Sequence, residues 1–364
     1  MLIIKNEEKL ENQNITSLKE QLETLQKASK HKEIIDIITN LPKEQLTFDM
    51  VCRLAAAYNN NEEYKKGLSA LMQVKDEGEN SALWNYHAGI SCYYLQKYKE
   101  AEKYLIKALE IYPDFDDTSS LLYCTYIKLF RKKLDEKKFS KACEYLNKCR
   151  PLIKNNEELI NFESELSYLY RLQNECGKAY ENIEKVMLLG RNDSWVYSEA
   201  GLCLFELEQY NKAMVYLEKS LALGKNDNWL YYYAALCADS LDDNEKQLKY
   251  LEEGVKLYPD DADLNYVFGV YYINQREYSK ALDYFNKAAE YDDKAELYTL
   301  TGLCNERVGK YDEAFDYYKK ALSFKDLPEI RKHISTLKKK ETFLLIFKII
   351  FAVVIIKVIL DIMF

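Results

Sequence analysis

The sequence predicts an all-α fold in which helical hairpins stack one after another as a solenoid. Gly89, Ala101 and Ala108 are separated by 12 and 7 residues, and the same spacing starts again at Gly269 and at Gly302. The pattern returns with a period near 34 residues, which is typical of repeats built from two helices. Glycine and proline number only 11 and 5, which leaves little room for long loops.

Each repeat is predicted to contain two helices that cross closely. A close crossing needs residues without bulky side chains at the point of contact. In the first helix these small residues are Ala55, Gly89, Ser167, Gly201, Ala235, Gly269 and Gly302. In the second helix they are Gly67, Ala101, Ala142, Ala179, Ala213, Ala281 and Ala314. A bulky residue follows four positions later, as at Leu105, Phe285 and Tyr318, and completes the apolar stripe of a helix buried on one side.

The turns between helices carry residues that end one helix and begin the next. Pro113 and Pro259 stand where a second helix has to stop, because proline disrupts a helix interior. Gly190 and Gly224 lie 34 residues apart and suit a left-handed helix C-terminus. Asp193, or the residue after it, is placed to cap the following helix.

On these residues the chain resembles the tetratricopeptide repeat family, whose signature is this spacing of small residues with an aromatic residue before the second helix. Clear repeats begin near residues 48, 82, 194, 228, 262 and 295, degenerate ones near 123 and 160, and a weak one near 15. The resemblance implies a right-handed superhelix of about eight to nine repeats over residues 15–328, degenerate near 115–193. Residues 1–14 are a polar segment outside the repeats.

Two features depart from the regular repeat. The interval between the repeats at 82 and 123 is 41 residues, longer than the period by about two helical turns. We expect the segment from Thr125 to Lys138 to lengthen a helix, with Phe130 in place of the small residue, and the superhelix to change direction near 115–160. Gln247 replaces alanine in a later repeat.

Charge and cysteine usage restrict the classes of function. The net charge is −8 and the isoelectric point is about 5.3, whereas nucleic-acid binding normally requires a basic face. We therefore expect no nucleic-acid partner. The chain has nine cysteines, an odd number that cannot all pair with one another. Cys203, Cys237 and Cys304 each stand two residues after the small residue of a first helix, so their positions follow the repeat. Packing of cysteine as a small apolar residue is favoured over a disulfide framework.

The C-terminal region is predicted to hold a basic juxtamembrane helix at 329–342 and a transmembrane helix at 343–364. Of the 22 residues from Phe343 to Phe364, 19 are apolar. A helix of that length spans about 33 Å, enough for a bilayer core. The lysines at 338–340 fit the rule that positive charge stays on the cytoplasmic side. We expect a tail anchor in a single-pass membrane protein whose repeats lie in the cytoplasm.

Three charged residues oppose this insertion and leave an alternative. Lys348, Lys357 and Asp361 interrupt the apolar run. A central charge costs ~2.5–3.5 kcal/mol on insertion, while each large apolar residue returns ~0.3–0.6 kcal/mol, so the sum favours insertion by a modest margin. The alternative is a hydrophobic helix that packs on the last repeat. The two lysines lie on opposite helix faces, which disfavours that packing.

No motif for catalysis or for cofactor binding is present. His31, His87 and His333 are far apart in the sequence, and the sequence contains no P-loop, dinucleotide fingerprint or HExxH metal motif. Acidic pairs such as Asp260 and Asp261 fall at turns, where helix capping explains them. We therefore expect a protein that is not an enzyme, without a cofactor, a metal or a small-molecule substrate.

Partner binding is expected in the concave groove lined by the first helices, as the family resemblance implies. The family's groove positions correspond here to residues that include Tyr86, Tyr93, Tyr94, Phe205, Tyr232, Asp239 and Tyr266. Aromatic side chains supply the large, rigid contact areas that often dominate protein interfaces. The residues that form the family's two-carboxylate clamp are absent. The alternative is that some rings only pack between neighbouring helices, Trp195 and Trp229 above all.

These observations favour a non-enzymatic scaffold for protein–protein interaction that is tethered to a membrane by its C-terminal anchor. A partner peptide or protein would lie in the groove, and the segment 343–364 would contact the membrane. The alternative is a soluble peptide-binding regulator or sensor whose hydrophobic C-terminal helix caps or inhibits the array.

Overall fold

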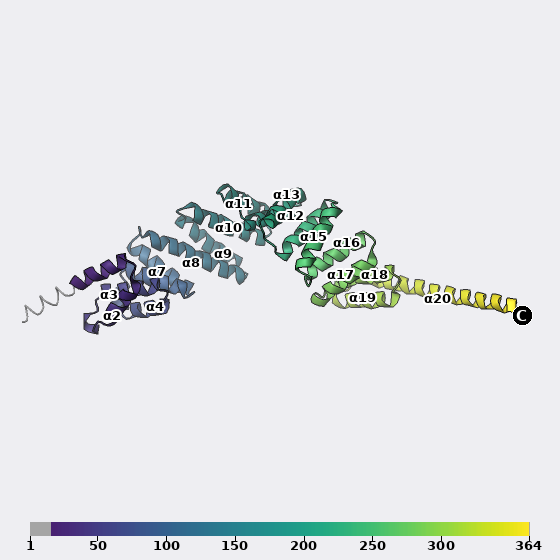
Figure 1. The fold of residues 1–364 in the computed structure, drawn as a ribbon, viewed down its shortest axis with the longest axis horizontal. Coiled ribbons are helices and arrows are strands. Elements are labelled where there is room, and N and C mark those ends of the chain that lie inside the picture. Colours follow the sequence, from purple (N-terminus) through teal and green to yellow (C-terminus); the bar gives the residue numbers. More distant parts are fainter. Residues whose placement is uncertain (1–15, 364) are drawn as a thin grey trace, which may run out of the picture. The chain divides into compact units, whose positions relative to one another are not determined.

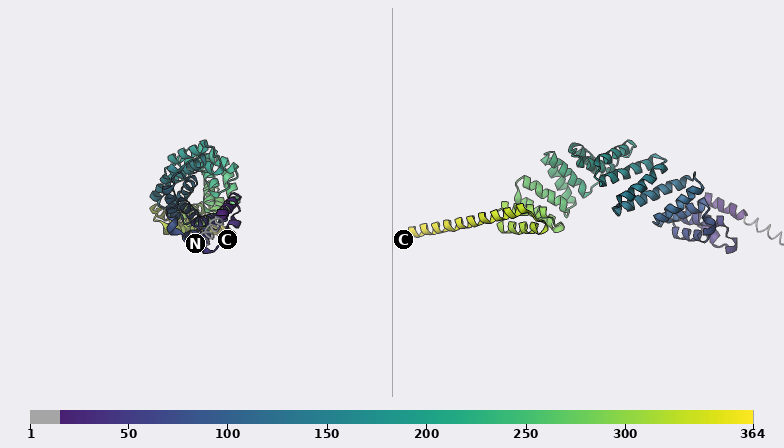
Figure 2. Two further views of the ribbon diagram at one scale, coloured as in Figure 1. Left: turned by 90° about the vertical axis from the view of Figure 1, so that its left-hand side faces the viewer. Right: turned by 180° about the vertical axis from the view of Figure 1, so that it is seen from behind.

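The computed structural model describes residues 16–363, which fold into helices and contain no strand. They form two compact units that divide between Leu169 and Tyr170. Within each unit, consecutive helices pair as hairpins that follow one another along the chain (Figures 1 and 2). The predicted all-α helical-repeat fold is confirmed, whereas the handedness of the superhelix and its change of direction stay predictions. The predicted polar segment 1–14 lies outside the described residues.

The first unit begins with a helical stretch over residues 16–27. Its further helices are α2 (His31–Thr39), α3 (Phe48–Asn60), α4 (Tyr64–Met72), α5 (Lys75–Gly78), α6 (Ala82–Tyr94), α7 (Tyr98–Ile111), α8 (Asp116–Asp135), α9 (Phe139–Cys149) and all but the last turn of α10 (Asn156–Leu172). Two short 3-10 helices also occur, η1 (Lys43–Gln45) and η2 (Arg150–Leu152).

The second unit continues with four complete hairpins and a long final helix. Its helices are α11 (Cys176–Leu188), α12 (Ser194–Glu206), α13 (Tyr210–Ala222), α14 (Asn228–Ser240), α15 (Asn244–Leu257), α16 (Ala262–Asn274), α17 (Tyr278–Tyr291), α18 (Ala295–Arg307), α19 (Tyr311–Phe324) and α20 (Pro328–Met363). The first helices of the hairpins in this unit are α12, α14, α16 and α18. They begin at the residues that the sequence pattern gives as repeat starts.

The small residues lie where the two helices of a hairpin cross, as predicted. A Cβ atom added to Gly89 would stand 2.5 Å from Leu105, and one added to Gly269 would stand 2.5 Å from Phe285. A Cβ atom added to Gly302 would stand 2.7 Å from Tyr318. Each bulky partner comes from the second helix of the same hairpin and fills the space that the missing side chain leaves.

The predicted turn residues adopt the expected conformations. Gly190 has φ +98° and Gly224 has φ +81°, the left-handed region that ends helices. The side chain of Asp193 accepts a hydrogen bond of 2.9 Å from the backbone N–H of Val196 and caps α12. These residues fix the points at which α11 and α13 end and the next helix begins.

The long interval between repeats produces a long helix. Helix α8 has 20 residues, against 13 in α6, and the extra length is added at its N-terminal end because it begins at Asp116 rather than near 123. Phe130 is fully buried in this helix. The guanidinium of Arg131 pairs with the buried carboxylate of Glu165 in α10 through Nε at 2.7 Å. The lengthened segment is therefore packed into the first unit.

Helix α20 is one continuous helix of 36 residues, and its first turns pack on the last repeat. Leu337 is 3% exposed, and it shares a buried cluster with Ala314, Phe315, Tyr318, Ile330 and Ile334. The Nε2 atom of His333 lies 2.8 Å from the Glu306 carboxylate in α18. Beyond this contact α20 extends as a single rod (Figures 1 and 2), where Ile349, Ile350 and Phe351 are exposed.

The predicted transmembrane helix at 343–364 and the single-pass membrane localisation are wrong. Across residues 16–363, no helix is both long enough and apolar enough to cross a bilayer. The physical reason is charge, because Lys348, Lys357 and Asp361 divide the apolar run and each central charge opposes insertion by ~2.5–3.5 kcal/mol. The predicted tail anchor is therefore not supported either.

None of the nine cysteines forms a disulfide, and seven of them are buried as packing residues, whereas Cys124 is exposed and Cys143 is partly buried. Cys203, Cys237 and Cys304 are fully buried in first helices. Burial raises the pKa of each of these thiols to about 12, because the charged thiolate loses its hydration. They are inert core residues.

Candidate binding surfaces on the first helices

The sequence-predicted site residues fall on two surfaces, one in each unit. Tyr86, Tyr93 and Tyr94 lie in α6 of the first unit. In the second unit, Phe205 lies in α12, Tyr232 and Asp239 lie in α14, and Tyr266 lies in α16.

The α6 surface is a cluster of rings. Tyr86 is half-buried with its ring 4.7 Å from that of Phe115. Tyr93 lies edge-on to Tyr94 at 5.2 Å, and Tyr94 is 54% exposed. Tyr64 of the preceding hairpin stacks on Tyr94 at 4.4 Å. Tyr64 was not among the predicted site residues, and its spacing in the repeat gives no sign that it lies on this surface.

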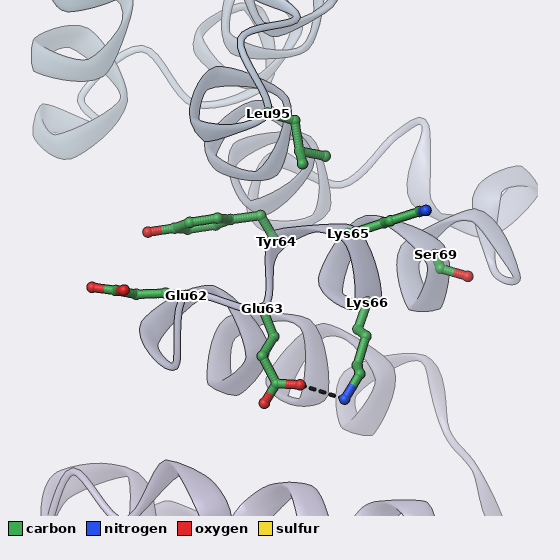
Figure 3. Close-up of a pocket in the computed structure, with 7 residues that line it drawn as sticks. All are labelled: Glu62, Glu63, Tyr64, Lys65, Lys66, Ser69 and Leu95. Carbon is green, nitrogen blue, oxygen red and sulfur yellow. Dashed lines mark hydrogen bonds and ion pairs between the residues drawn. The ribbon is translucent and has the colours of Figure 1, made fainter.

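A hollow of about 530 Å³ lies beside Tyr64, yet its side chains do not converge. Figure 3 shows Tyr64 and Glu62 reaching toward one side and Lys65 and Ser69 lying on the other. Glu63 pairs with Lys66 across its lower edge. The hollow therefore lacks a common focus at which a ligand could be held.

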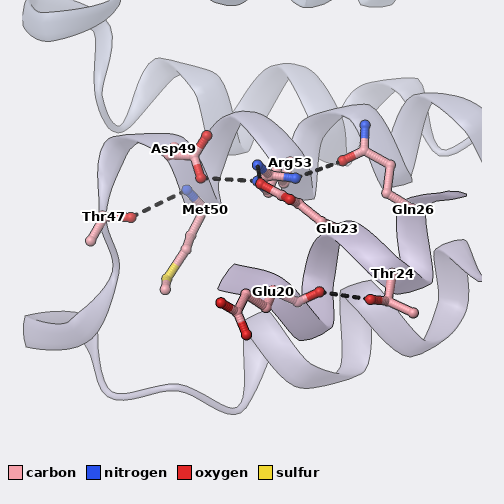
Figure 4. A network of polar contacts seen from close by, with 8 residues as sticks. All are labelled: Glu20, Glu23, Thr24, Gln26, Thr47, Asp49, Met50 and Arg53. Carbon is pink, nitrogen blue, oxygen red and sulfur yellow. Dashed lines mark hydrogen bonds and ion pairs between the residues drawn. The ribbon is translucent and has the colours of Figure 1, made fainter. Parts of the chain in front are cut away.

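A polar network elsewhere in the first unit is structural. Arg53 in α3 donates from Nε to Asp49 at 2.9 Å and from Nη1 to Gln26 at 2.9 Å (Figure 4). It also pairs with Glu23 at 3.1 Å. Both Glu23 and Gln26 belong to the helical stretch 16–27. Arg53 thus holds that stretch against α3, and each of its three guanidinium nitrogens has a partner there.

On the second unit, a row of aromatic rings runs from α12 to α14. Phe205 lies edge-on to Tyr233 at 5.0 Å, and Tyr233 lies edge-on to Tyr232 at 5.2 Å. Tyr233 was not among the predicted site residues, although it directly follows Tyr232. The ring of Tyr233 contacts both Phe205 of the preceding repeat and Tyr232 of its own helix, and so makes the row continuous.

Tyr232 and Tyr266 meet at a cleft of about 200 Å³ between α14, α16 and the start of α18. The two residues are 34 positions apart, one repeat, so the stacking of hairpins brings them to equivalent places on neighbouring helices. The buried Ala288 and Leu297 also line the cleft. Its apolar surface therefore comes from three successive hairpins.

The rim of the cleft carries charge. The Lys294 ammonium lies 2.5 Å from Asp292 and 3.3 Å from Asp263. Its hydrogen bond to Asp292 raises the pKa of Lys294 above its usual value. Burial raises the pKa of Tyr232 and that of Tyr266, and the nearby carboxylates of Asp263 and Glu296 respectively add to the effect. Both tyrosines are therefore neutral hydrogen-bond donors at neutral pH.

Asp239 occupies a different position from the other predicted residues of this unit. Its Oδ1 accepts a hydrogen bond of 3.0 Å from Nε2 of Gln247 in α15, the residue that replaces the small alanine and is 2% exposed. Asp239 does not line the cleft. Its carboxylate is held within its own hairpin, where it satisfies a buried amide.

Trp195 and Trp229 are the rings for which packing between neighbouring helices is the main alternative to partner binding. Each ring is covered by a cation of the second unit. The Arg191 guanidinium lies 4.9 Å from the Trp195 ring, and the Lys225 ammonium lies 4.9 Å from the Trp229 ring. Over residues 16–363, no three His, Cys, Asp or Glu side chains form a group that could hold a metal ion.

Four stretches of the chain match the tetratricopeptide repeat family: residues 85–115, 196–227, 262–294 and 295–326. They coincide with the hairpins α6–α7, α12–α13, α16–α17 and α18–α19. The prediction of tetratricopeptide repeats is confirmed. The protein is thus a helical-repeat protein that carries such repeats in both units.

Among solved structures, the chain is similar to MamA and YrrB, while no curated protein matches it. A crystal structure of MamA is 23% identical with a TM-score of 0.42, over 46% of this chain and 92% of that one. The structure of YrrB, described as a TPR protein with an unusual peptide-binding site, is 22% identical with a TM-score of 0.43, over 57% and 97%. MamA 41-end from Desulfovibrio magneticus RS-1 is 21% identical with a TM-score of 0.41, over 46% and 93%.

Proposed function

We propose that this protein is a non-enzymatic scaffold that binds an extended segment of a partner protein along the first helices of its second unit. The observation that carries the proposal is the cleft shared by Tyr232 and Tyr266. Because equivalent residues of successive repeats form it, a segment running across α14, α16 and α18 contacts each helix in turn.

The size of the cleft favours a side chain of a larger partner over a free small molecule. Small-molecule sites usually enclose ~300–1,000 Å³, whereas this cleft has about 200 Å³. One side chain fits that volume, and the rings of Phe205 and Tyr233 continue the surface toward α12. Aromatic anchors in a row are the usual energetic centre of a protein interface.

The C-terminal helix has a capping role in this proposal. Terminal repeats have no outer neighbour and need a covering element. The first turns of α20 supply it, since Leu337 packs against Phe315 and Tyr318 of α19. This agrees with the reading in which the C-terminal helix covers the array.

The α6 surface is a second candidate for partner binding. Tyr86, Tyr93 and Tyr94 remain proposed contact residues there, with Tyr64 added because it stacks on the exposed Tyr94.

The test is a pull-down from lysate of the source cells with mass spectrometry. Changing Tyr232 and Tyr266 together to Ala should weaken capture, because truncation of aromatic anchors costs ~2 kcal/mol or more of binding free energy. The matched control changes Tyr291 and Tyr317, two tyrosines of the same unit outside the cleft lining. Far-UV circular dichroism checks that each variant is folded. Equal capture by a folded double variant and by wild type would refute binding at the cleft.

A further inference from the structure

The cleft between α14, α16 and α18 holds more negative than positive charge. Asp263, Asp292 and Glu296 line it together with a single cation, Lys294. Lys294 is committed to Asp292 and Asp263. In the described part of the chain, Glu296 forms no ion pair, and its side chain is exposed. Two carboxylate charges are therefore left without compensation at neutral pH.

The aromatic walls add a second attraction for cations. The face of a tyrosine ring carries partial negative charge and attracts an ammonium or guanidinium group within ~6 Å. The second unit already uses this contact repeatedly, since Lys320 lies 4.1 Å from the Tyr298 ring and Lys219 lies 5.2 Å from the Tyr216 ring. Tyr232 and Tyr266 differ, because no cation within residues 16–363 covers either ring.

From these observations we propose that the cleft binds an arginine or lysine side chain of the partner segment. The cationic group would lie between the rings of Tyr232 and Tyr266 and pair with Glu296 and Asp263. The buried methyl and isobutyl groups of Ala288 and Leu297 would contact its aliphatic stem, as long basic side chains prefer. This inference rests on the proposed function and names the chemistry of its partner.

The structure argues for a cation over an anion or a neutral residue at this position. An acidic side chain would meet three carboxylates against one ammonium, and like charges in a partly desolvated site repel strongly. A neutral apolar residue would fill the volume but would leave the excess negative charge of the cleft uncompensated. Only a basic residue satisfies both the rings and the carboxylates.

Selection from a random peptide library displayed on phage tests the inference with the full-length protein. Wild type should enrich peptides that contain arginine or lysine beside apolar residues. A variant with Asp263→Asn and Glu296→Gln should still enrich peptides through its tyrosines but without the basic preference. The matched control carries Asp312→Asn and Asp316→Asn, which remove the same charge from exposed positions of α19 and should keep the basic preference.

The outcomes separate the inference from the function on which it rests. Enrichment of neutral or acidic peptides whose binding needs Tyr232 and Tyr266 would keep the peptide-binding function and overturn the cation site. Enrichment of basic peptides that bind the Asp263→Asn, Glu296→Gln variant equally well would also overturn it. If wild type enriches no peptide, the proposed function fails and the inference fails with it.

Affinity measurements give the quantitative form of the test. One selected peptide that contains arginine is compared with a copy in which that arginine is replaced by citrulline, which keeps the shape of the side chain and removes its charge. Fluorescence polarisation should show wild type binding the citrulline peptide about ten-fold more weakly. The Asp263→Asn, Glu296→Gln variant should bind both peptides alike. Equal affinity of wild type for both peptides would contradict the proposal.

Discussion

At the scale of single residues, glycines at the helix crossings set how closely each hairpin packs. A side chain at Gly269 or Gly302 would collide with an aromatic ring at 2.5 or 2.7 Å. Gly177 is different, because a Cβ atom there would meet nothing within 4 Å. Two glycines in helices of the same unit thus have opposite roles, which allows a matched comparison.

Replacing Gly269 with Ala should destabilise the protein by ~1–3 kcal/mol, because the ring of Phe285 must shift in a filled core. Replacing Gly177 with Ala should stabilise it by up to ~1 kcal/mol, since alanine restricts the unfolded chain and favours a helix. Urea unfolding followed by circular dichroism measures both. If both substitutions changed stability in the same direction, the packing described for these crossings would be wrong.

His87 in α6 is a residue whose surroundings predict a pH effect. Its Nδ1 atom is buried and has no hydrogen-bond partner within the described chain, while its backbone carbonyl accepts a bond of 3.0 Å from Asn59. Burial lowers the pKa of His87 from 6.5 to about 4. The folded protein therefore keeps this imidazole neutral over a range in which the unfolded chain becomes protonated.

Above pH 6.5 His87 is neutral in both the folded and the unfolded protein, and its burial leaves the free energy of unfolding intact. As the pH falls from 6.5 toward 4, the unfolded chain binds a proton at His87 that the folded protein does not, so the free energy of unfolding decreases. The linked loss is on the order of 2–3 kcal/mol. Comparison of wild type with His87→Leu by urea unfolding at several pH values isolates it, since the carboxylates contribute to both proteins. We expect the free-energy difference between the two to grow in favour of the variant below pH 6.5. A difference that stays constant with pH would show that His87 titrates normally.

At the scale of elements, the turn inside each hairpin holds one residue in the left-handed conformation. Within residues 16–363, glycine occupies this place only at Gly309, with φ +84°, whereas Glu208, Asp242 and Arg276 have φ of 57°, 56° and 62°. At Arg276 the amide donates to Ile273, and the next amide donates to Tyr272, which is the pattern of a Schellman turn. Backbone hydrogen bonds thus hold Arg276 in a left-handed conformation that residues with a side chain rarely adopt.

Replacing Arg276 with Gly should stabilise the protein by ~0.5–1 kcal/mol. The strain of a left-handed residue costs ~1–2 kcal/mol, and the added flexibility of glycine in the unfolded state offsets part of it. The reverse change, Gly309→Ala, should destabilise by a similar amount. Thermal unfolding of the two variants against wild type checks both signs. A lower melting temperature for Arg276→Gly would rule out strain at this turn.

Helices and crossings could be predicted from the sequence because each depends on contacts within one repeat. The small residues and their bulky partners lie in the same hairpin, so their spacing alone indicates the packing of Gly89 on Leu105. Helix α8 shows where this reasoning loses accuracy. The sequence indicates a longer helix, but the added residues extend it toward Asp116 rather than toward Lys138.

At the scale of the whole molecule, the last repeat depends on α20 for its cover. Among the α20 side chains that the structure describes, this contact is made by the first part of the helix, with Leu337 buried and Ile349 exposed. Deletion of 341–364 should therefore leave the melting temperature almost unchanged. Deletion of 327–364 should lower it by about 5–10 °C, because Phe315 and Tyr318 lose their cover. Differential scanning calorimetry compares the two, and an equal effect of both deletions would contradict the capping role.

The cleft could be predicted only in part, because it needs three hairpins in register. The family's groove positions point to Tyr232 and Tyr266, and the structure places both in the cleft. Lys294 and Asp292 lie in the connection between α17 and α18, outside any groove position, and no sequence signal draws them to the tyrosines. Asp239 belongs to the same predicted set, but its carboxylate accepts a hydrogen bond from Gln247. This bond exists because glutamine stands in that hairpin at the position where other repeats have alanine.

The central claim is that a partner segment lies across the first helices of the second unit. Hydrogen–deuterium exchange of the full-length protein, with and without a peptide selected from the library, tests it most directly. We predict slower exchange in α14, in α16 and at the start of α18, where Tyr232, Tyr266 and Glu296 lie, with α13, α15 and α19 unchanged. Protection confined to the second helices or to α20 would contradict the account.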